Sequence, residues 1–272
     1  VYAFFQEIGI LDAAGRPTEH FGDPVWVYEQ FLRRRGDERP SEVIQADGRV
    51  RMAEVRARGV FLAEGHGHRT WDLEPSLARD IGRIYDDSKA SLWTELDAAF
   101  IAGVQNHRHV MTRSSNRSDY ILHPQTGEQL SAEAIEAVLE LRRAQAGEFD
   151  VQIVVSDGLN SLAISDPGHL APFLDEVRAA LLRDGFRPAP QHIVVTSGRV
   201  RAGYRIGELL FGGLAGRRAL LHVIGERPGT GHHTFSVYIT APDGSVWGEP
   251  DRVDHNITKV VSGIAVTALD PL

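Results

Sequence analysis

The hydrophobic positions follow two different periods along the chain, and the period changes near Gly147. Before this point, apolar residues recur at helical spacing over residues 24–35, and the spacing predicts an amphipathic helix there. The same pattern predicts a long helix over residues 75–104 and a further one over 131–146. The polar segment between these two helices is rich in turn residues and predicts no regular element.

After Gly147, the pattern is that of alternating strands and helices. Short, mostly apolar runs predict three strands, over residues 150–155, 192–196 and 219–224. Helical patterns lie between them, over residues 170–182 and 204–211. This alternation favours right-handed crossovers and a parallel sheet. A hairpin over residues 235–248, turning at Pro242-Asp243-Gly244, is expected at the edge of the sheet.

These elements predict an α/β fold in which a mainly parallel sheet has helices on both sides, as in Rossmann-like three-layer domains, with an edge hairpin. Three regions are expected: a helical segment over residues 1–75, a helical linker region over 76–148 and an α/β domain over 149–272. Because the chain opens within an apolar run, Tyr2-Ala3-Phe4-Phe5, and has no initial methionine, we expect it to be a piece of a longer protein.

Composition narrows the classes of function. The 272 residues include 29 Lys and Arg against 37 Asp and Glu, a net charge of −8, which argues against electrostatic binding to nucleic acid. The absence of cysteine excludes disulfides, thiolate metal sites and cysteine nucleophiles. No apolar run reaches the roughly 18 residues of a membrane span, and no signal peptide opens the chain. A cytoplasmic protein with no membrane partner is therefore expected.

Each predicted strand of the α/β domain ends in a polar loop that contains glycine. These loops are Ser156-Asp157-Gly158, Ser197-Gly198-Arg199 and the run from Gly225 to Gly231. Because the carboxyl ends of parallel strands share one edge, the loops are either ordinary strand exits or a ligand-binding edge. Neither a G-x-G-x-x-G fingerprint nor the Lys-Ser/Thr of a phosphate loop is present, which disfavours simple nucleotide binding.

Histidine pairs are the other candidate chemistry. His66 with His68, and His232 with His233, carry imidazoles that suit zinc, copper or iron. Neither pair has a carboxylate and a further histidine at a recognised spacing, so no metal site is predicted. The sequence also lacks a G-x-S-x-G nucleophile elbow, and no catalytic residue is predicted.

Five stretches, in this order and spacing, resemble the small subunit of ethanolamine ammonia-lyase over residues 80–272. They are residues 150–159 (DVQIVVSDGL), 197–200 (SGRV), 206–209 (IGEL), 224–229 (IGERPG) and 249–257 (EPDRVDHNI). Residues 1–75 resemble instead the tail of the large, barrel-forming subunit of the same enzyme. The resemblance therefore implies a fusion of large and small subunits, of which this chain is the C-terminal part.

The resemblance implies a coenzyme B12 enzyme that converts 2-aminoethanol to acetaldehyde and ammonia by radical rearrangement. In this family the partner barrel holds the small-molecule substrate, and cobalamin lies between the barrel and the small subunit. Family cobalamin contacts fall on Val200 and Glu226, and a third falls near Asp254, where the family commonly has cysteine. Arg199 and Arg227 are added on physical grounds, as donors to amide carbonyls or to the nucleotide phosphate.

The cofactor implied is adenosylcobalamin with its own benzimidazole on cobalt, since no Asp-x-His-x-x-Gly occurs in the sequence. The implied partner is the large subunit, in a hetero-oligomer that lies in the cytoplasm or in a bacterial microcompartment, and the chain alone is expected to be inactive. Two other hypotheses stay open at this point. One is a non-catalytic scaffold subunit that makes no cofactor contact, and the other is a nucleotide-binding oxidoreductase domain.

Overall fold

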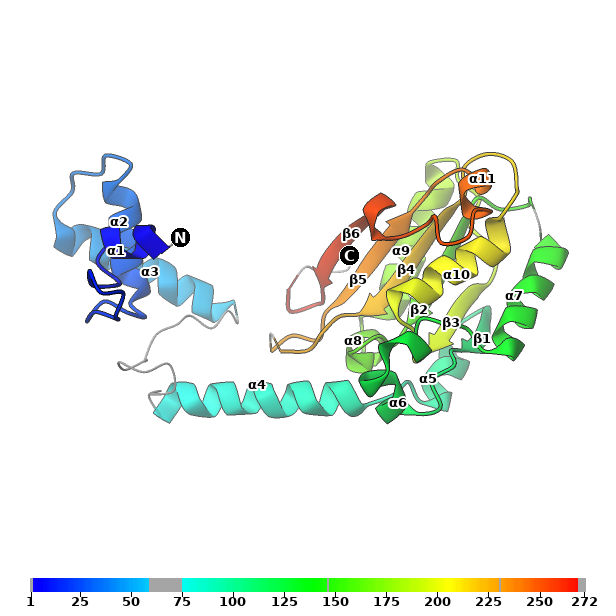
Figure 1. The fold of residues 1–272 in the computed structure, drawn as a ribbon, viewed down its shortest axis with the longest axis horizontal. Coiled ribbons are helices and arrows are strands. Elements are labelled where there is room, and N and C mark those ends of the chain that lie inside the picture. The colour runs from blue at the N-terminus through cyan, green and yellow to red at the C-terminus, as the bar shows by residue number, and fades with distance from the viewer. Residues whose placement is uncertain (1, 59–74, 146, 230, 269–272) are drawn as a thin grey trace. The chain divides into compact units, whose positions relative to one another are not determined.

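A computed structural model of the chain describes residues 2–58, 75–145, 147–229 and 231–268 (Figure 1). The chain divides into two compact units, Val1–Asp86 and Asp87–Leu272, and each is treated separately below. Helix α4, Pro75–Trp93, crosses the boundary between them. In the part of the chain that the structure describes, no helix has both the length and the apolar composition that a membrane crossing requires.

The first unit is helical, as predicted. Besides the start of α4 it contains α1 (Tyr2–Glu7), α2 (Pro24–Arg33) and α3 (Ser41–Ala57). Asp23 caps α2, because its carboxylate accepts hydrogen bonds from the backbone N–H groups of Val25 and Trp26, at 2.9 and 3.1 Å. The buried carboxylate of Glu29 accepts hydrogen bonds from Ser41 at 2.6 Å and from Gln45 at 2.8 Å, which fixes α2 against α3.

The second unit is built on a six-stranded sheet with the order β1-β3-β2-β4-β5-β6. Its strands are β1 (His107–Met111), β2 (Val151–Ser156), β3 (His192–Thr196), β4 (Ala219–Gly225), β5 (Phe235–Thr240) and β6 (Thr258–Ile264). The first four in this order pair in parallel, whereas β5 is antiparallel to β4 and β6 is antiparallel to β5. The α/β class is confirmed, but β5 and β6 depart from the mainly parallel, Rossmann-like sheet that the sequence predicted.

The expected edge hairpin is wrong in its second half. Its first arm is β5, but the residues expected to form the other arm form the short helix α11, Gly244–Trp247. The Trp247 side chain is 1% exposed, and its indole N–H donates to the Arg218 carbonyl at 2.9 Å. This buried side chain holds the segment against the core. The second antiparallel neighbour of β5, besides β4, is therefore β6 and not residues 244–247.

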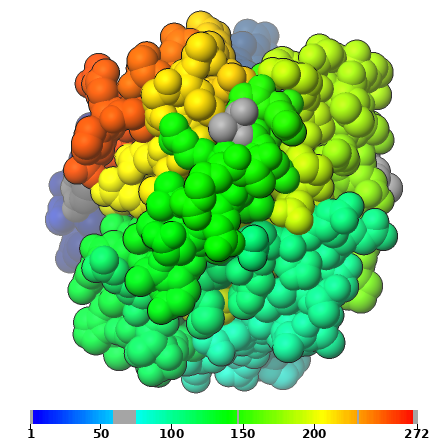
Figure 2. Space-filling view, turned by 90° about the vertical axis from the view of Figure 1, so that its right-hand side faces the viewer, coloured from blue at the N-terminus to red at the C-terminus, as the bar shows by residue number. Residues whose placement is uncertain are grey.

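Helices cover both faces of the sheet (Figure 1). One apolar cluster joins one face of the sheet to α7 (Ala132–Gln145) and α10 (Val200–Phe211), which lie side by side in Figure 2, a view turned by 90° from that of Figure 1. The other joins the opposite face to α5 (Ala98–Gly103), α8 (Ser161–Ser165) and α9 (Leu170–Arg183). The remaining elements are α6 (Arg117–Leu122) and two 3₁₀ turns, Pro124–Thr126 and His255–Ile257.

The helix predicted over residues 75–104 is two helices, α4 and α5. The chain leaves the first after Trp93 and starts the second at Asp97, whose carboxylate accepts a hydrogen bond from the Phe100 N–H at 2.6 Å. A side chain that caps a helix start interrupts the helical path although the apolar spacing continues through it.

Candidate functional site

A cavity of about 300 Å³ opens where the parallel strands β2, β3 and β4 end. We call it the carboxyl-edge cleft. The loop after each of these strands contributes to its wall, and the side chains that matter below are Arg199, Val200, Glu226 and Arg227, together with Tyr120, Tyr238 and His255. This is the edge at which open α/β sheets generally bind ligands.

Two glycines bring the loops after β2 and β4 into contact. A Cβ on Gly158 would lie 2.1 Å from the carbonyl oxygen of Gly225, and Gly158 has a positive φ of 57°. A Cβ on Gly225 would lie 2.0 Å from the carbonyl oxygen of Asn160. Only glycine allows this backbone approach, so the floor of the cleft is made of closely packed main chain.

A buried ion pair ties the loops after β2 and β3 together. The Asp157 carboxylate is fully buried and accepts hydrogen bonds from the backbone N–H groups of Ser197 and Gly198 and from the Arg117 guanidinium, each at 3.1 Å. Burial raises the pKa of Asp157 to about 6, against the opposing effects of Arg117 and the two N–H groups. Ser197 has a φ of 55°, and this left-handed conformation lets its N–H face the carboxylate.

The Arg199 guanidinium is oriented by Tyr120. It lies 4.6 Å from the centre of the Tyr120 ring, and its Nη2 donates to the Tyr120 carbonyl at 2.9 Å. Arg117 lies over the same ring at 4.7 Å. The Nε of Arg199 is buried and has no hydrogen-bond partner among the described residues. Arg199 is therefore held in a fixed orientation in the wall of the cleft.

Glu226 follows β4 directly and is held by backbone and side-chain contacts. Its N–H donates to the Thr234 carbonyl at 2.9 Å, and its carboxylate accepts a hydrogen bond from the Tyr238 hydroxyl at 3.4 Å. Burial, and then the charge of Glu226, raise the pKa of Tyr238 to about 12. Among the described residues, Glu226 pairs with neither Arg227 nor Arg252, so its carboxylate is not taken up in a surface ion pair.

Asp254 does not line the cleft, unlike the other four residues predicted as cofactor contacts. It lies one position before His255, whose ring reaches the cleft wall, and its carboxylate contacts the Arg201 guanidinium at 3.4 Å. Hydrogen bonds from His255, and then the Arg201 charge, lower the pKa of Asp254 to about 2. The carboxylate therefore stays ionised and orients two lining residues, Arg201 and His255.

The model of the ethanolamine ammonia-lyase light chain family matches residues 59–271. The chain belongs to this family. Small subunits of ethanolamine ammonia-lyase resemble it at 36% identity over 116 residues in Pseudomonas putida (strain GB-1) and 36% over 167 residues in Pseudomonas fluorescens (strain Pf0-1). A third, from Xanthomonas campestris pv. campestris, is 33% identical over 139 residues.

These alignments cover 43%, 59% and 50% of this chain and 40%, 58% and 48% of the respective relatives. The chain thus spans about half the length of the curated relatives it matches. The family match includes the three loops after β2, β3 and β4 that line the carboxyl-edge cleft, and it begins after the helices α1 to α3.

Sequence analysis of this light-chain domain missed several lining residues. Tyr238 lies on β5 and Arg201 in the first turn of α10, and neither stands in a polar, glycine-containing loop. Tyr120 lies on α6, in a segment predicted to have no regular structure. Strand and helix positions carry no local signal for a ligand edge, and only the sheet order brings these side chains to the strand ends.

The candidate histidines make other contacts. His66 and His68 lie outside the described residues. His232 contacts the Thr267 hydroxyl at 2.9 Å, and His233 lies between the carboxylates of Asp166 and Asp87. Among the described residues of this light-chain domain, no three or more His, Asp or Glu side chains are arranged so that they could hold a metal ion.

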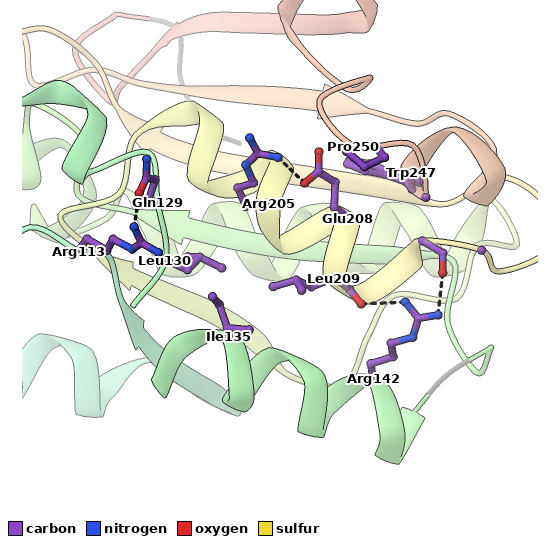
Figure 3. A pocket seen from close by; sticks show the side chains of 13 residues that line it. Arg113, Gln129, Leu130, Ile135, Arg142, Arg205, Glu208, Leu209, Trp247 and Pro250 are labelled. Carbon is purple, nitrogen blue, oxygen red and sulfur yellow. Dashed lines mark hydrogen bonds and ion pairs between the residues drawn. The ribbon is translucent and has the colours of Figure 1, made fainter. Parts of the chain in front are cut away.

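A larger cavity of about 680 Å³ lies between α7, α10 and α11, away from the predicted residues (Figure 3). Its arginines are turned toward internal partners. Arg142 donates to the carbonyls of Leu209 and Gly212, at 2.9 and 2.6 Å, and Arg205 contacts Glu208 at 2.8 Å. Its walls are mainly apolar, Arg142 bonds backbone carbonyls, Arg205 is paired with carboxylates, and none of the residues predicted as cofactor contacts lines it, so the carboxyl-edge cleft is the better candidate site.

Proposed function

We propose that this chain provides the cobalamin-contacting surface of a coenzyme B12-dependent ethanolamine ammonia-lyase. Such an enzyme converts 2-aminoethanol to acetaldehyde and ammonia. The light-chain family match supports the subunit role. The observation that carries the proposed surface is the convergence of Arg199, Val200, Glu226 and Arg227 on one cleft.

The groups in the cleft suit the rim of a corrin, which carries neutral amides. The Glu226 carboxylate can accept a hydrogen bond from an amide N–H, and the Arg227 and Arg199 guanidinium groups can donate to amide carbonyls. A cavity of about 300 Å³ is at the low end for sites that enclose a drug-sized ligand. Since cobalamin is larger, this chain would contact one part of it and the large subunit would cover the rest.

When bound, adenosylcobalamin with its benzimidazole ligated would supply the radical that starts the rearrangement. The residues of this chain would bind and orient it, and none of them would act on the substrate. The stiffness of the cleft supports this role. Asp157 fixes two of its loops, and the main chain is closely packed at Gly158 and Gly225 in its floor.

The partner proposed is the large, barrel-forming subunit, which holds the substrate, in a hetero-oligomer of the cytoplasm or of a microcompartment. We propose further that residues 1–75 are the tail of that subunit, fused to a linker region over 76–148 and to the cobalamin-facing domain over 149–272. Two facts support the separation of the first segment: the family match begins at residue 59, and α1 to α3 lie in the first unit, Val1–Asp86.

Replacing Glu226 tests the proposed function. In the complete enzyme, Glu226→Ala should weaken cobalamin binding by about 1.5–3 kcal/mol, or ten- to a hundredfold, because it removes a charged hydrogen-bond acceptor. Affinity is measured by titrating the visible spectrum of the cofactor. Glu226→Gln keeps the shape and one acceptor, so it should lose less.

Glu249→Ala is the matched control, because the Glu249 side chain is exposed, lies outside the cleft and has its carboxylate 3.8 Å from Arg252. It should bind cobalamin as the unaltered enzyme does. Unchanged affinity of Glu226→Ala in a normally assembled enzyme would reject the proposal and favour a scaffold subunit that makes no cofactor contact.

A further inference from the structure

His233 is held between two carboxylates that come from different parts of the second unit. Its Nδ1 lies 2.6 Å from an oxygen of Asp166, in the connection between α8 and α9. Its Nε2 lies 3.2 Å from both oxygens of Asp87 on α4, and the Ser91 hydroxyl of the same helix is 3.4 Å from Nε2. Both ring nitrogens therefore face acceptor oxygens.

Donation to both carboxylates at once needs a protonated ring. A neutral imidazole has one N–H and one lone pair, so it can donate to only one of the two carboxylates and would turn its lone pair toward the other. An imidazolium donates from both nitrogens and neutralises part of the charge of the two carboxylates. The His233 side chain is 21% exposed, so the contact is shielded from water in part.

The histidine stands next to the closing hydrogen bond of the loop that carries the proposed cofactor contacts. We call residues 226–234 the β4–β5 loop. Its first residue, Glu226, donates its backbone N–H to the carbonyl of Thr234, the neighbour of His233. Further along the loop, a Cβ on Gly229 would lie 4.0 Å from the Ser88 hydroxyl of α4. The described part of the loop thus approaches one helix at two points.

We propose that His233 is a positioning residue: its protonated ring, bridging Asp87 and Asp166, fixes the β4–β5 loop so that Glu226 and Arg227 are held ready for the cofactor. We call the contact of the His233 ring with Asp87 and Asp166 the clamp. The effect of the clamp on the cofactor rests on the proposed function, whereas the clamp itself does not. Because the ring must be charged to bridge both carboxylates, the clamp makes loop order and cofactor affinity depend on pH.

The direction of this dependence follows from the groups that face the ring. Among the described residues these are Asp87 and the Ser91 hydroxyl from α4 and Asp166 from the α8–α9 connection. Burial disfavours the imidazolium, but hydrogen bonds to Asp166 and Asp87 outweigh it and raise the pKa of His233 above its ordinary value. The clamp is then complete at pH values below the ordinary histidine pKa of about 6.5 and is lost as the pH rises through the raised value.

Hydrogen exchange of the complete enzyme without cofactor tests the clamp directly. Amide protection of the β4–β5 loop should fall by about two- to fivefold as the pH rises through the His233 titration, after correction for intrinsic exchange, as for one partly exposed ion pair. His233→Asn, which can reach only one carboxylate, should show the lower protection at every pH. His232→Gln is the matched control and should behave as the unaltered enzyme. Protection that does not change with pH would overturn the proposal.

Cobalamin affinity tests the consequence. It should weaken about two- to fivefold over the same pH range in the unaltered enzyme and stay flat in His233→Asn. Asp87→Asn and Asp166→Asn should each move the midpoint of the profile to lower pH, because each removes a charge that favours the imidazolium. A role limited to folding would change stability without moving this midpoint, and an unmoved midpoint would overturn the proposal.

The two proposals fail in different ways. If loop protection follows the His233 titration while Glu226→Ala leaves cobalamin affinity unchanged, the clamp stands and the proposed function fails. If Glu226→Ala weakens binding while His233→Asn keeps the pH profiles of the unaltered enzyme, the function stands and the clamp fails.

Discussion

Asp157 is the residue on which the geometry of the carboxyl-edge cleft depends most. One buried carboxylate joins the end of β2, the turn before α10 and α6, through Ser197, Gly198 and Arg117. A buried charge is costly unless it is paired and hydrogen-bonded, and all three of its contacts are donors. Burial disfavours the charged form of this carboxyl group and raises its pKa to about 6.

The variant Asp157→Asn should show how the free-energy cost of burying the Asp157 carboxylate varies with pH. At pH 5, where both side chains are uncharged, the variant should be less stable by about 1–3 kcal/mol, because its amide NH₂ faces N–H donors. The folded carboxyl has the higher pKa, so the folded state binds the proton more tightly and the unaltered protein loses stability as the pH rises through about 4 to 6 and beyond. The difference between the two proteins should therefore narrow toward pH 8.

The free energy of unfolding of both proteins is measured in urea at pH 5 and at pH 8. The contributions of all other titrating groups cancel in the difference between the two proteins. A difference that widens with pH would mean that Arg117 and the two N–H groups outweigh burial and hold the pKa of Asp157 below its ordinary value.

Sequence reasoning reached the site residues that stand in loops and missed those on regular elements. Arg199 and Glu226 stand in the loops that follow the predicted strands, so the strand ends pointed to them. Tyr238 reaches the cleft only because β5 lies antiparallel beside β4, a pairing that the sequence did not predict. Asp254 was expected to be a direct contact, but it lies beside the cleft and orients Arg201 and His255.

At the scale of elements, burial decided which strands the sequence could predict. The three central strands β2, β3 and β4 are almost continuously apolar, since helices cover both of their faces, and all three predictions are confirmed. The outer strands β1 and β6 were missed, because edge strands are largely exposed and carry residues such as His107, Arg108 and Lys259. The same turn residues that suggested a hairpin at Pro242-Asp243-Gly244 also suit the start of a helix, which is what they form.

The end of α10 should depend on a side chain from α7. Arg142 donates to the carbonyls of Leu209 and Gly212 (Figure 3), which the helix itself leaves without partners. Arg142→Ala should lower the free energy of unfolding by about 1.5–3 kcal/mol, because two hydrogen bonds to a charged group are lost. Thermal or urea unfolding followed by circular dichroism measures the change.

Arg143→Ala is the matched control, since the neighbouring guanidinium is exposed and lies 3.9 Å from Glu136. Its cost should stay below about 0.5 kcal/mol. Equal effects of the two substitutions would show that the contacts of Arg142 at the end of α10 add nothing to stability.

At the scale of the whole molecule, the first unit has exposed aromatic rings that a partner could cover. In the first, Phe4 and Phe31 are 41% and 48% exposed, each beneath an arginine, Arg34 or Arg35. If residues 1–75 are the tail of the large subunit, as proposed, these rings should lie against the barrel. Protease digestion should then cut this unit readily in the isolated chain and slowly in the complete enzyme, and equal rates would contradict the fusion.

The isolated chain should not deaminate 2-aminoethanol, even with coenzyme B12 present and oxygen excluded. The carboxyl-edge cleft offers groups that hold a ligand, and under the proposed function the substrate and the radical steps belong to the partner barrel. Acetaldehyde release is measured with a coupled dehydrogenase, and addition of large subunit should restore it. Turnover by the 272 residues alone would overturn this division of roles.

The contact between Gly158 and Gly225 also limits how the protein can evolve. At each position an added methyl group would collide with the main chain of the other loop. A side chain at either glycine would therefore displace both loops. A substitution at one glycine cannot be compensated at the other, which already has the smallest side chain. Insertions or deletions beside either glycine would shift the same contact. We therefore expect substitutions to be rare in the two paired loops and to accumulate on the outer strands and helices.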